Sequence, residues 1–170
     1  STSIPVTLLS TPLCIDPKGN ETLTQTKTEP TNPLYSLDKQ QSSLVYYDKN
    51  TIVLTMPYWV KVTNSSVEDS ELKKHSFVLS YDPTTMKDTD TKLKLYISHV
   101  VDDAGETVTR SNFTYAYRAY SIRDALTVFK EKTGKLPKYL ELTAKTNSSK
   151  DELKEESGET SVEYDYAFTE

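Results

Sequence analysis

The stretch LVYYDKNTIVLTMPYWVKVT (residues 44–63) carries the clearest secondary-structure pattern in the chain. Its second half has apolar residues at every second position: Ile52, Leu54, Met56, Tyr58, Val60 and Val62. This spacing places their side chains on one face of a β-strand. Asp48-Lys49-Asn50 predicts the turn of a hairpin. Pro57, on the opposite face, indicates a sheet edge or a bulge, because proline donates no ladder hydrogen bond.

Alternating stretches continue along the chain after this hairpin. They are HSFVLSYD (75–82), KLKLYISHVV (92–101), TVTRSNFTYAYRAY (107–120), KYLELTAKT (138–146) and VEYDYAFTE (162–170). One helix is predicted at about residues 121–133. Ser121 is its expected N-cap, Gly134 is suited to the residue after its end, and Pro137 prevents continuation.

The order of elements predicts a mainly β (α+β) fold. Five strands precede the helix and two follow it, so the strands must cover most of one another. We therefore expect an antiparallel β-sandwich or partly closed barrel with one packed α-helix. The predicted division is an extended N-terminal arm (1–43) and a single β-rich domain (44–170). The lack of a repeating βα pattern argues against a parallel sheet.

The N-terminal arm is rich in proline and contains Thr22, Thr24, Thr26 and Thr28 at alternating positions. Alternating β-branched residues favour an extended chain that can pair at a sheet edge. We expect this edge to belong to a second subunit; the edge of the arm's own domain and a disordered polar tail are the alternatives.

Composition narrows the possible partners. No apolar run approaches the length of a membrane-spanning helix, and residues 4–15 do not resemble a signal peptide. Cys14 is the only cysteine, so no disulfide forms within the chain. The acidic excess lies in residues 141–170, and there are only three arginines. Without a basic cluster, nucleic acid is not an expected partner.

Few residues are available for catalysis or for holding a cofactor. The chain has two histidines and four glycines, and it lacks the spacings of hydrolase, EF-hand and phosphate-binding motifs. We therefore expect no enzymatic activity, no cofactor and no metal. His75 and His99 lie on the apolar faces of two predicted strands, so neighbouring strands would point both rings into one space.

Tyrosines dominate the aromatic residues. Phe113, Tyr115 and Tyr117 alternate on one strand, and Tyr164, Tyr166 and Phe168 on another. We expect these stripes to face the core along their length and an interface at their ends. Trp59 lies opposite the core face of its strand and is predicted to be exposed. Asn20, Asn64, Asn112 and Asn147 stand in glycosylation sequons.

Two functions fit these patterns. The first is a non-enzymatic structural or assembly subunit, either a virion component such as a phage tail or capsid protein or a surface filament protein. It would self-associate through the arm (Thr22–Thr28) and through tyrosine-rich edges at Tyr58, Tyr115, Tyr117, Tyr164 and Tyr166. The second is a secreted or cell-surface module that binds a carbohydrate or small apolar ligand through Trp59 and the tyrosines. Both place the protein outside the cell or in a virion.

Overall fold

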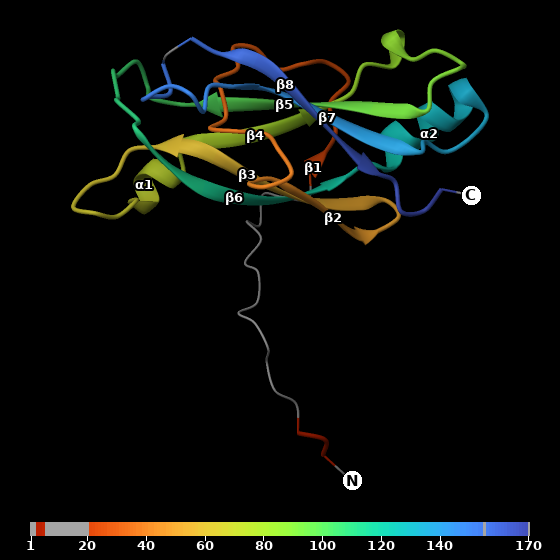
Figure 1. The fold of residues 1–170 in the computed structure, drawn as a ribbon, viewed down its shortest axis with the longest axis horizontal. Helices are drawn as coiled ribbons and strands as arrows, with labels where there is room; N and C mark the ends of the chain where they lie inside the picture. Colours follow the sequence, from red (N-terminus) through yellow and green to blue (C-terminus); the bar gives the residue numbers. More distant parts are fainter. Residues whose placement is uncertain (1–2, 6–20, 155, 170) are drawn as a thin grey trace.

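The computed structural model describes residues 3–5, 21–154 and 156–169, and Figure 1 shows their arrangement. Two four-stranded sheets pack face to face, in the orders β1-β6-β3-β2 and β4-β5-β7-β8. The first comprises β1 (Glu21–Thr22), β6 (Asn112–Ser121), β3 (Thr51–Val60) and β2 (Ser43–Asp48). The second comprises β4 (His75–Ser80), β5 (Lys92–Val101), β7 (Tyr139–Thr146) and β8 (Gly158–Asp165). The predicted β-sandwich is confirmed.

The hairpin of residues 44–60 is present as predicted. β2 and β3 pair antiparallel around the turn at Asp48, and the inward side chains of β3 are almost completely buried. Pro57 lies beyond the end of β2, where β3 forms the sheet edge. There the backbone N–H of Tyr35 donates to the Pro57 carbonyl at 3.0 Å. Proline is tolerated at such a position because no ladder donor is required.

The sheets are mixed, because two strand pairs run parallel. β5 pairs parallel with β7, and β1 with β6. After β5 the chain crosses to the other sheet as β6 and returns through α2 (Arg123–Thr133), so β7 enters in the direction of β5. The expectation of purely antiparallel pairing is therefore wrong for these two pairs.

Helix α2 lies at one end of the sandwich (Figure 1). Ala125, Leu126 and Phe129 are buried on its inner face, and Gly134 adopts the left-handed conformation with φ 78°. The predicted N-cap is wrong by one residue. Ser121 is the last residue of β6, and Ile122 occupies the N-cap position without a side-chain hydrogen bond. Pairing of Ser121 with Thr51 extends the strand and displaces the cap.

Two short helical segments complete the described elements. They are α1 (Asp69–Leu72), between β3 and β4, and the 3-10 turn η2 (Pro83–Thr85), after β4. Within the described residues, no helix combines the length and the apolar character needed to cross a membrane.

Residues 21–43 of the arm pack on their own domain. Thr24 exchanges backbone hydrogen bonds with the end of β4, and the N–H of Asn32 donates to the His99 carbonyl at 2.7 Å. The N–H of Leu34 donates to the Lys145 carbonyl at 2.8 Å, so the arm enters between β5 and β7. Leu23, Leu34 and Leu37 are buried. Residues 21–43 therefore cover an edge of their own chain, which is the alternative to the expected pairing with a second subunit. The division at residue 43 stays a prediction.

The aromatic stripe of β6 faces outward, which corrects the prediction that it faces the core. Tyr58 of β3 pairs with Thr114, and Met56 pairs with Ala116. Residues directly opposite in a ladder share a face, so the register turns Tyr115 and its in-phase neighbours away from the core. Phe113 and Tyr115 are 40% and 39% exposed.

Tyrosines close the side of the sandwich where β2 lies over β8. The Tyr46 hydroxyl donates to the Asp165 carbonyl at 2.8 Å, that of Tyr164 to Ser42 at 3.3 Å and that of Tyr166 to Lys49 at 2.7 Å. Each bond joins one sheet to the other. These residues are contacts between the two sheets within one chain.

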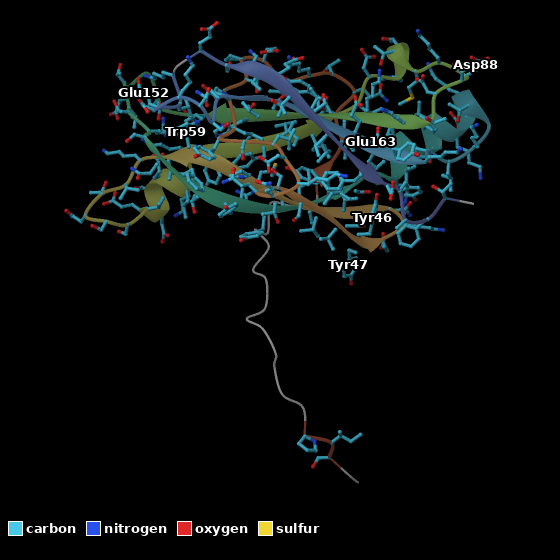
Figure 2. All side chains as sticks on the ribbon, in the orientation of Figure 1. Tyr46, Tyr47, Trp59, Asp88, Glu152 and Glu163 are labelled. Carbon is cyan, nitrogen blue, oxygen red and sulfur yellow. The ribbon has the colours of Figure 1, made fainter. Side chains whose placement is uncertain are left out.

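Removing one of these hydroxyls should lower stability slightly. We expect Tyr166→Phe to reduce the free energy of unfolding by about 1 kcal/mol, because the Lys49 carbonyl loses its donor while packing is kept. Tyr47→Phe is the matched control, because Tyr47 is 81% exposed and points away from the sheet (Figure 2). Urea denaturation of both variants measures the difference. Equal stabilities would show that the hydroxyl bond contributes nothing.

Candidate functional site

A cleft of about 340 Å³ opens at the end of the sandwich where β3 ends and β6 begins. Its lining comes from four separate segments: Tyr35 of the arm, Trp59 of β3, Ser111–Phe113 at the start of β6, and Lys150 and Asp151 of the β7–β8 loop. The volume is at the lower end of the range for small-molecule sites.

Aromatic rings form one wall of the cleft. The rings of Tyr35 and Phe113 are stacked, with centroids 4.1 Å apart and planes 14° from parallel. The Trp59 ring meets Tyr35 edge-on at 5.0 Å. Phe113 keeps 40% of its surface exposed, whereas Trp59 keeps only 2%. Phe113 therefore presents aromatic surface to solvent while Trp59 supports the wall from behind.

The predicted exposure of Trp59 is wrong, because the arm and the β7–β8 loop cover it. Its indole N–H donates to the side-chain oxygen of Asn147 at 2.5 Å. The Asn147 amide in turn donates to the carbonyls of Glu152 and Leu153. Figure 2 shows Trp59 and Glu152 at the same end of the sandwich. Asn147 is itself buried, which disfavours a glycan at this sequon, and glycosylation of the sequons stays a prediction.

Polar groups border the aromatic wall. Asn112 and Asp151 are exposed and Lys150 is half-buried. The N–H of Lys150 donates to the Asn147 carbonyl, and the N–H of Leu153 donates to the Arg110 carbonyl. These bonds fix the loop against the start of β6. The cleft thus combines an apolar wall with hydrogen-bonding groups of both kinds.

A second cluster of polar residues lies inside the protein. Arg110 binds Glu71 through Nε at 2.6 Å and Asp103 through Nη1 and Nη2 at 2.9 and 2.6 Å. Glu71 also accepts from the backbone N–H of Lys61. Burial alone would raise the pKa of Glu71, but the hydrogen bonds from Arg110 and His75 lower it to about 2. Glu71 is therefore ionised at neutral pH.

His75 and His99 extend this cluster, and the prediction that their rings share one space is confirmed. His75 Nδ1 lies 2.8 Å from His99 Nε2, and His75 Nε2 lies 3.0 Å from Glu71. Burial lowers the pKa of both imidazoles, that of His99 to about 3. His99 is 0% exposed and Arg110 is 1% exposed. A general acid or base must reach its substrate, so these residues do not form the candidate site.

The structure distributes the other predicted site residues widely. Tyr58 is buried against His75, with ring centroids 4.8 Å apart. Thr24 and Thr26 are exposed on the arm, Thr28 is half-buried there, and Thr22 belongs to β1. Tyr115 and Tyr117 lie on the outer face of β6, and Asn64 is exposed. Asn20 and Cys14 lie outside the described residues. The described residues contain no group of three or more His, Cys, Asp or Glu arranged for a metal ion.

Sequence reasoning missed Tyr35, Lys150 and Asp151 as cleft residues. No local signal marks them, because each lies in a polar segment far in sequence from the residues it meets. Trp59 does line the cleft, but the reason given for choosing it, its exposure, was wrong, because it supports the wall from a buried position.

Comparison with known proteins identifies structural relatives. No protein-family model matches the sequence, and no curated protein does. The chain is similar to the crystal structure of a "Putative lipoprotein" from Bacteroides fragilis NCTC 9343, with a TM-score of 0.70 and 28% identity, over 89% of this chain and 71% of that one. An uncharacterized protein from Parabacteroides merdae ATCC 43184 is more distant, with a TM-score of 0.49 and 14% identity, over 87% of this chain and 66% of that one.

Proposed function

We propose that the protein is a non-enzymatic binding module of a surface or secreted protein, and that its cleft holds a carbohydrate. The observation that carries the proposal is the stacked Tyr35–Phe113 pair, which lies beside Asn112, Lys150 and Asp151 in an open cleft. The similarity to a protein described as a lipoprotein supports the location. The comparisons add nothing in favour of a virion role, and we do not propose one.

Sugars match this combination of groups. A pyranose ring has apolar C–H faces, which pack on aromatic rings, and hydroxyls at its edge, which each donate and accept hydrogen bonds. The exposed surface of Phe113 can take the ring face. The Asn112 amide can donate and accept, Lys150 can donate, and Asp151 can accept. The groups required for orientation and for packing therefore lie side by side.

The lining favours binding over hydrolysis. Glycoside hydrolases use two carboxyl groups that flank the scissile bond. Among the residues that line the cleft, Asp151 supplies the only carboxyl group, and neither histidine is present. The ligand is accordingly expected to leave the cleft unchanged.

Replacing the exposed ring tests the proposal. Neutral and acidic oligosaccharides would be screened by thermal shift, and the affinity of any that bind would be measured by calorimetry. We expect Phe113→Ala to weaken binding about tenfold or more, which corresponds to about 1.4 kcal/mol. Tyr47→Ala, at an exposed aromatic residue outside the cleft, should leave affinity unchanged. A screen without binders, or equal losses in both variants, would contradict the proposal.

A second candidate, an assembly subunit, is favoured by the open edges of the sheets. Among the described strands, β1, β2, β4 and β8 each have a neighbouring strand on one side only, and β2 has exposed apolar side chains. Val45 and Tyr47 of β2 are 58% and 81% exposed. An open edge can add a strand from another copy of the chain. Light scattering separates the candidates, because rings or polymers support assembly and a monomer stabilised by sugar supports the binding module.

A further inference from the structure

A line of three contacts connects Glu71 to the N-terminal arm through both histidine rings. Glu71 Oε1 lies 3.0 Å from His75 Nε2, His75 Nδ1 lies 2.8 Å from His99 Nε2, and His99 Nδ1 lies 3.1 Å from the Pro33 carbonyl oxygen. Both ends of this line only accept hydrogen bonds, since Glu71 is ionised and a peptide carbonyl has no hydrogen to give. Every hydrogen in the line must therefore come from the two imidazoles.

The number of hydrogens determines how many protons the pair can hold. Each neutral imidazole has a single N–H group, so two neutral rings supply two hydrogens for three contacts. One additional proton completes the line. A second additional proton would place the N–H groups of His75 and His99 against each other across 2.8 Å. The geometry accommodates one extra proton and no more.

One charged group, the carboxylate of Glu71, contacts the histidine pair directly. The charged groups that face the pair are Glu71 of α1 and, through Glu71, Arg110 and Asp103 of the β5–β6 connection. Lys74 reaches Asp103 from outside at 3.8 Å, and Tyr58 of β3 packs edge-on against both rings. Arg110 and Lys74 together match the charges of Glu71 and Asp103, so the limit of one proton rests on the hydrogen-bond geometry. Burial opposes protonation and lowers the pKa of both rings below the usual value, and the neighbouring His75 lowers that of His99 further.

Before the extra proton is taken up, one of the three contacts lacks its hydrogen. An ionised carboxylate is a stronger acceptor than a peptide carbonyl, so the hydrogen of His75 remains on Nε2, towards Glu71. The 2.8 Å approach of the two rings requires the hydrogen of His99 on Nε2. His99 Nδ1 is then bare towards Pro33.

We propose that His75 and His99 form a one-proton acid sensor that fastens the arm to the second sheet. In mild acid the pair takes one proton from solvent, and His99 Nδ1 then donates to the Pro33 carbonyl. The resulting line of hydrogen bonds runs without a gap from Glu71 to the arm. The sensor does not depend on the cleft or on its ligand.

Nuclear magnetic resonance of the full chain tests this proposal directly. Nitrogen-15 shifts of the imidazoles and the carbon-13 carbonyl shift of Pro33 would be followed from about pH 7.5 to about pH 4, a range that spans the usual histidine pKa of about 6.5. We expect one proton for the two rings together, with a midpoint below the usual value, and a Pro33 shift with the same midpoint. Two protons, no proton, or an unmoved Pro33 signal would each overturn the proposal.

The variant His99→Gln supplies a matched control. A glutamine amide can donate permanently to the Pro33 carbonyl and accept from His75, yet it does not titrate. We expect the Pro33 shift to become independent of pH in this variant while His75 still takes up a proton. A Pro33 shift that follows pH as in the natural chain would contradict the assignment to His99. Should the variant fail to fold, the Pro33 titration in the natural chain decides the question alone.

Discussion

A chain that lacks residues 1–40 is expected not to fold. Within this segment Leu23, Leu34 and Leu37 are buried, with exposures of 6%, 0% and 3%. Each buried leucine is worth about 2–5 kcal/mol when truncated to alanine, and the sum approaches the whole stability of a typical domain, about 5–15 kcal/mol. The deletion also removes the arm's hydrogen bonds to Leu79, His99 and Lys145. The expected result is a poorly dispersed amide spectrum without a cooperative urea transition.

A graded variant keeps this prediction quantitative. Leu34→Ala should reduce the free energy of unfolding by about 2–5 kcal/mol, because it leaves a cavity in the hydrophobic core. Val45→Ala is the control, since Val45 is apolar but 58% exposed, and its effect should stay within about 0.5 kcal/mol. A truncated protein that unfolds cooperatively at the urea concentration of the full chain would show that the arm is a separate part. The same experiment tests the division at residue 43.

The second large effect is expected for Arg110→Met, which should cost about 3–5 kcal/mol of folding free energy. The substitution leaves Glu71 and Asp103 without the guanidinium that binds both, and a buried charge that loses its partner is strongly destabilising. The methionine side chain fills part of the same volume. Most of the lost folding free energy is therefore due to the missing positive charge. Urea denaturation at neutral pH measures it.

The same substitution at an exposed arginine controls for the change of residue type. Arg123 is exposed at the start of α2, and Arg123→Met should alter stability by no more than about 0.5 kcal/mol. A loss below about 1 kcal/mol for Arg110→Met would mean that water or structural adjustment compensates the two carboxylates, contrary to the buried arrangement.

Local pattern was sufficient where one face of an element is uniformly apolar. In β3 the side chains of Ile52, Leu54 and Met56 alternate without interruption, and all three are buried as predicted. Helix α2 ends at Gly134 because the left-handed conformation there suits glycine. The sequence placed His75 and His99 on apolar strand faces, and the pairing of β4 with β5 in the structure supplied the condition for their rings to meet.

The local pattern did not predict which face of a strand is buried when both faces carry residues that suit the core. In β6 the aromatic residues alternate with Thr114, Ala116 and Arg118, and the period of two does not say which set faces the core. The register with β3 determines which set faces the core. The apolar face of β3 is inward, and Ala116 lies on the same face because it pairs with Met56. The prediction that Trp59 is exposed was wrong for a similar reason. The residues that contact and bury it, Tyr35 and Asn147, are far from it in sequence.

The amino-acid sequence by itself determined the class of fold. Local periodicity predicts a strand-rich chain, the hairpin at residues 44–60 and the single helix. The residue inventory shows that known catalytic motifs are absent. Only the tertiary structure decided which face of β6 is outside, where the arm lies and that Tyr35, Phe113 and Asp151 meet at one cleft. The physical reason is that periodicity depends on neighbours along the chain, whereas register, burial and cleft formation depend on contacts between segments far apart in sequence.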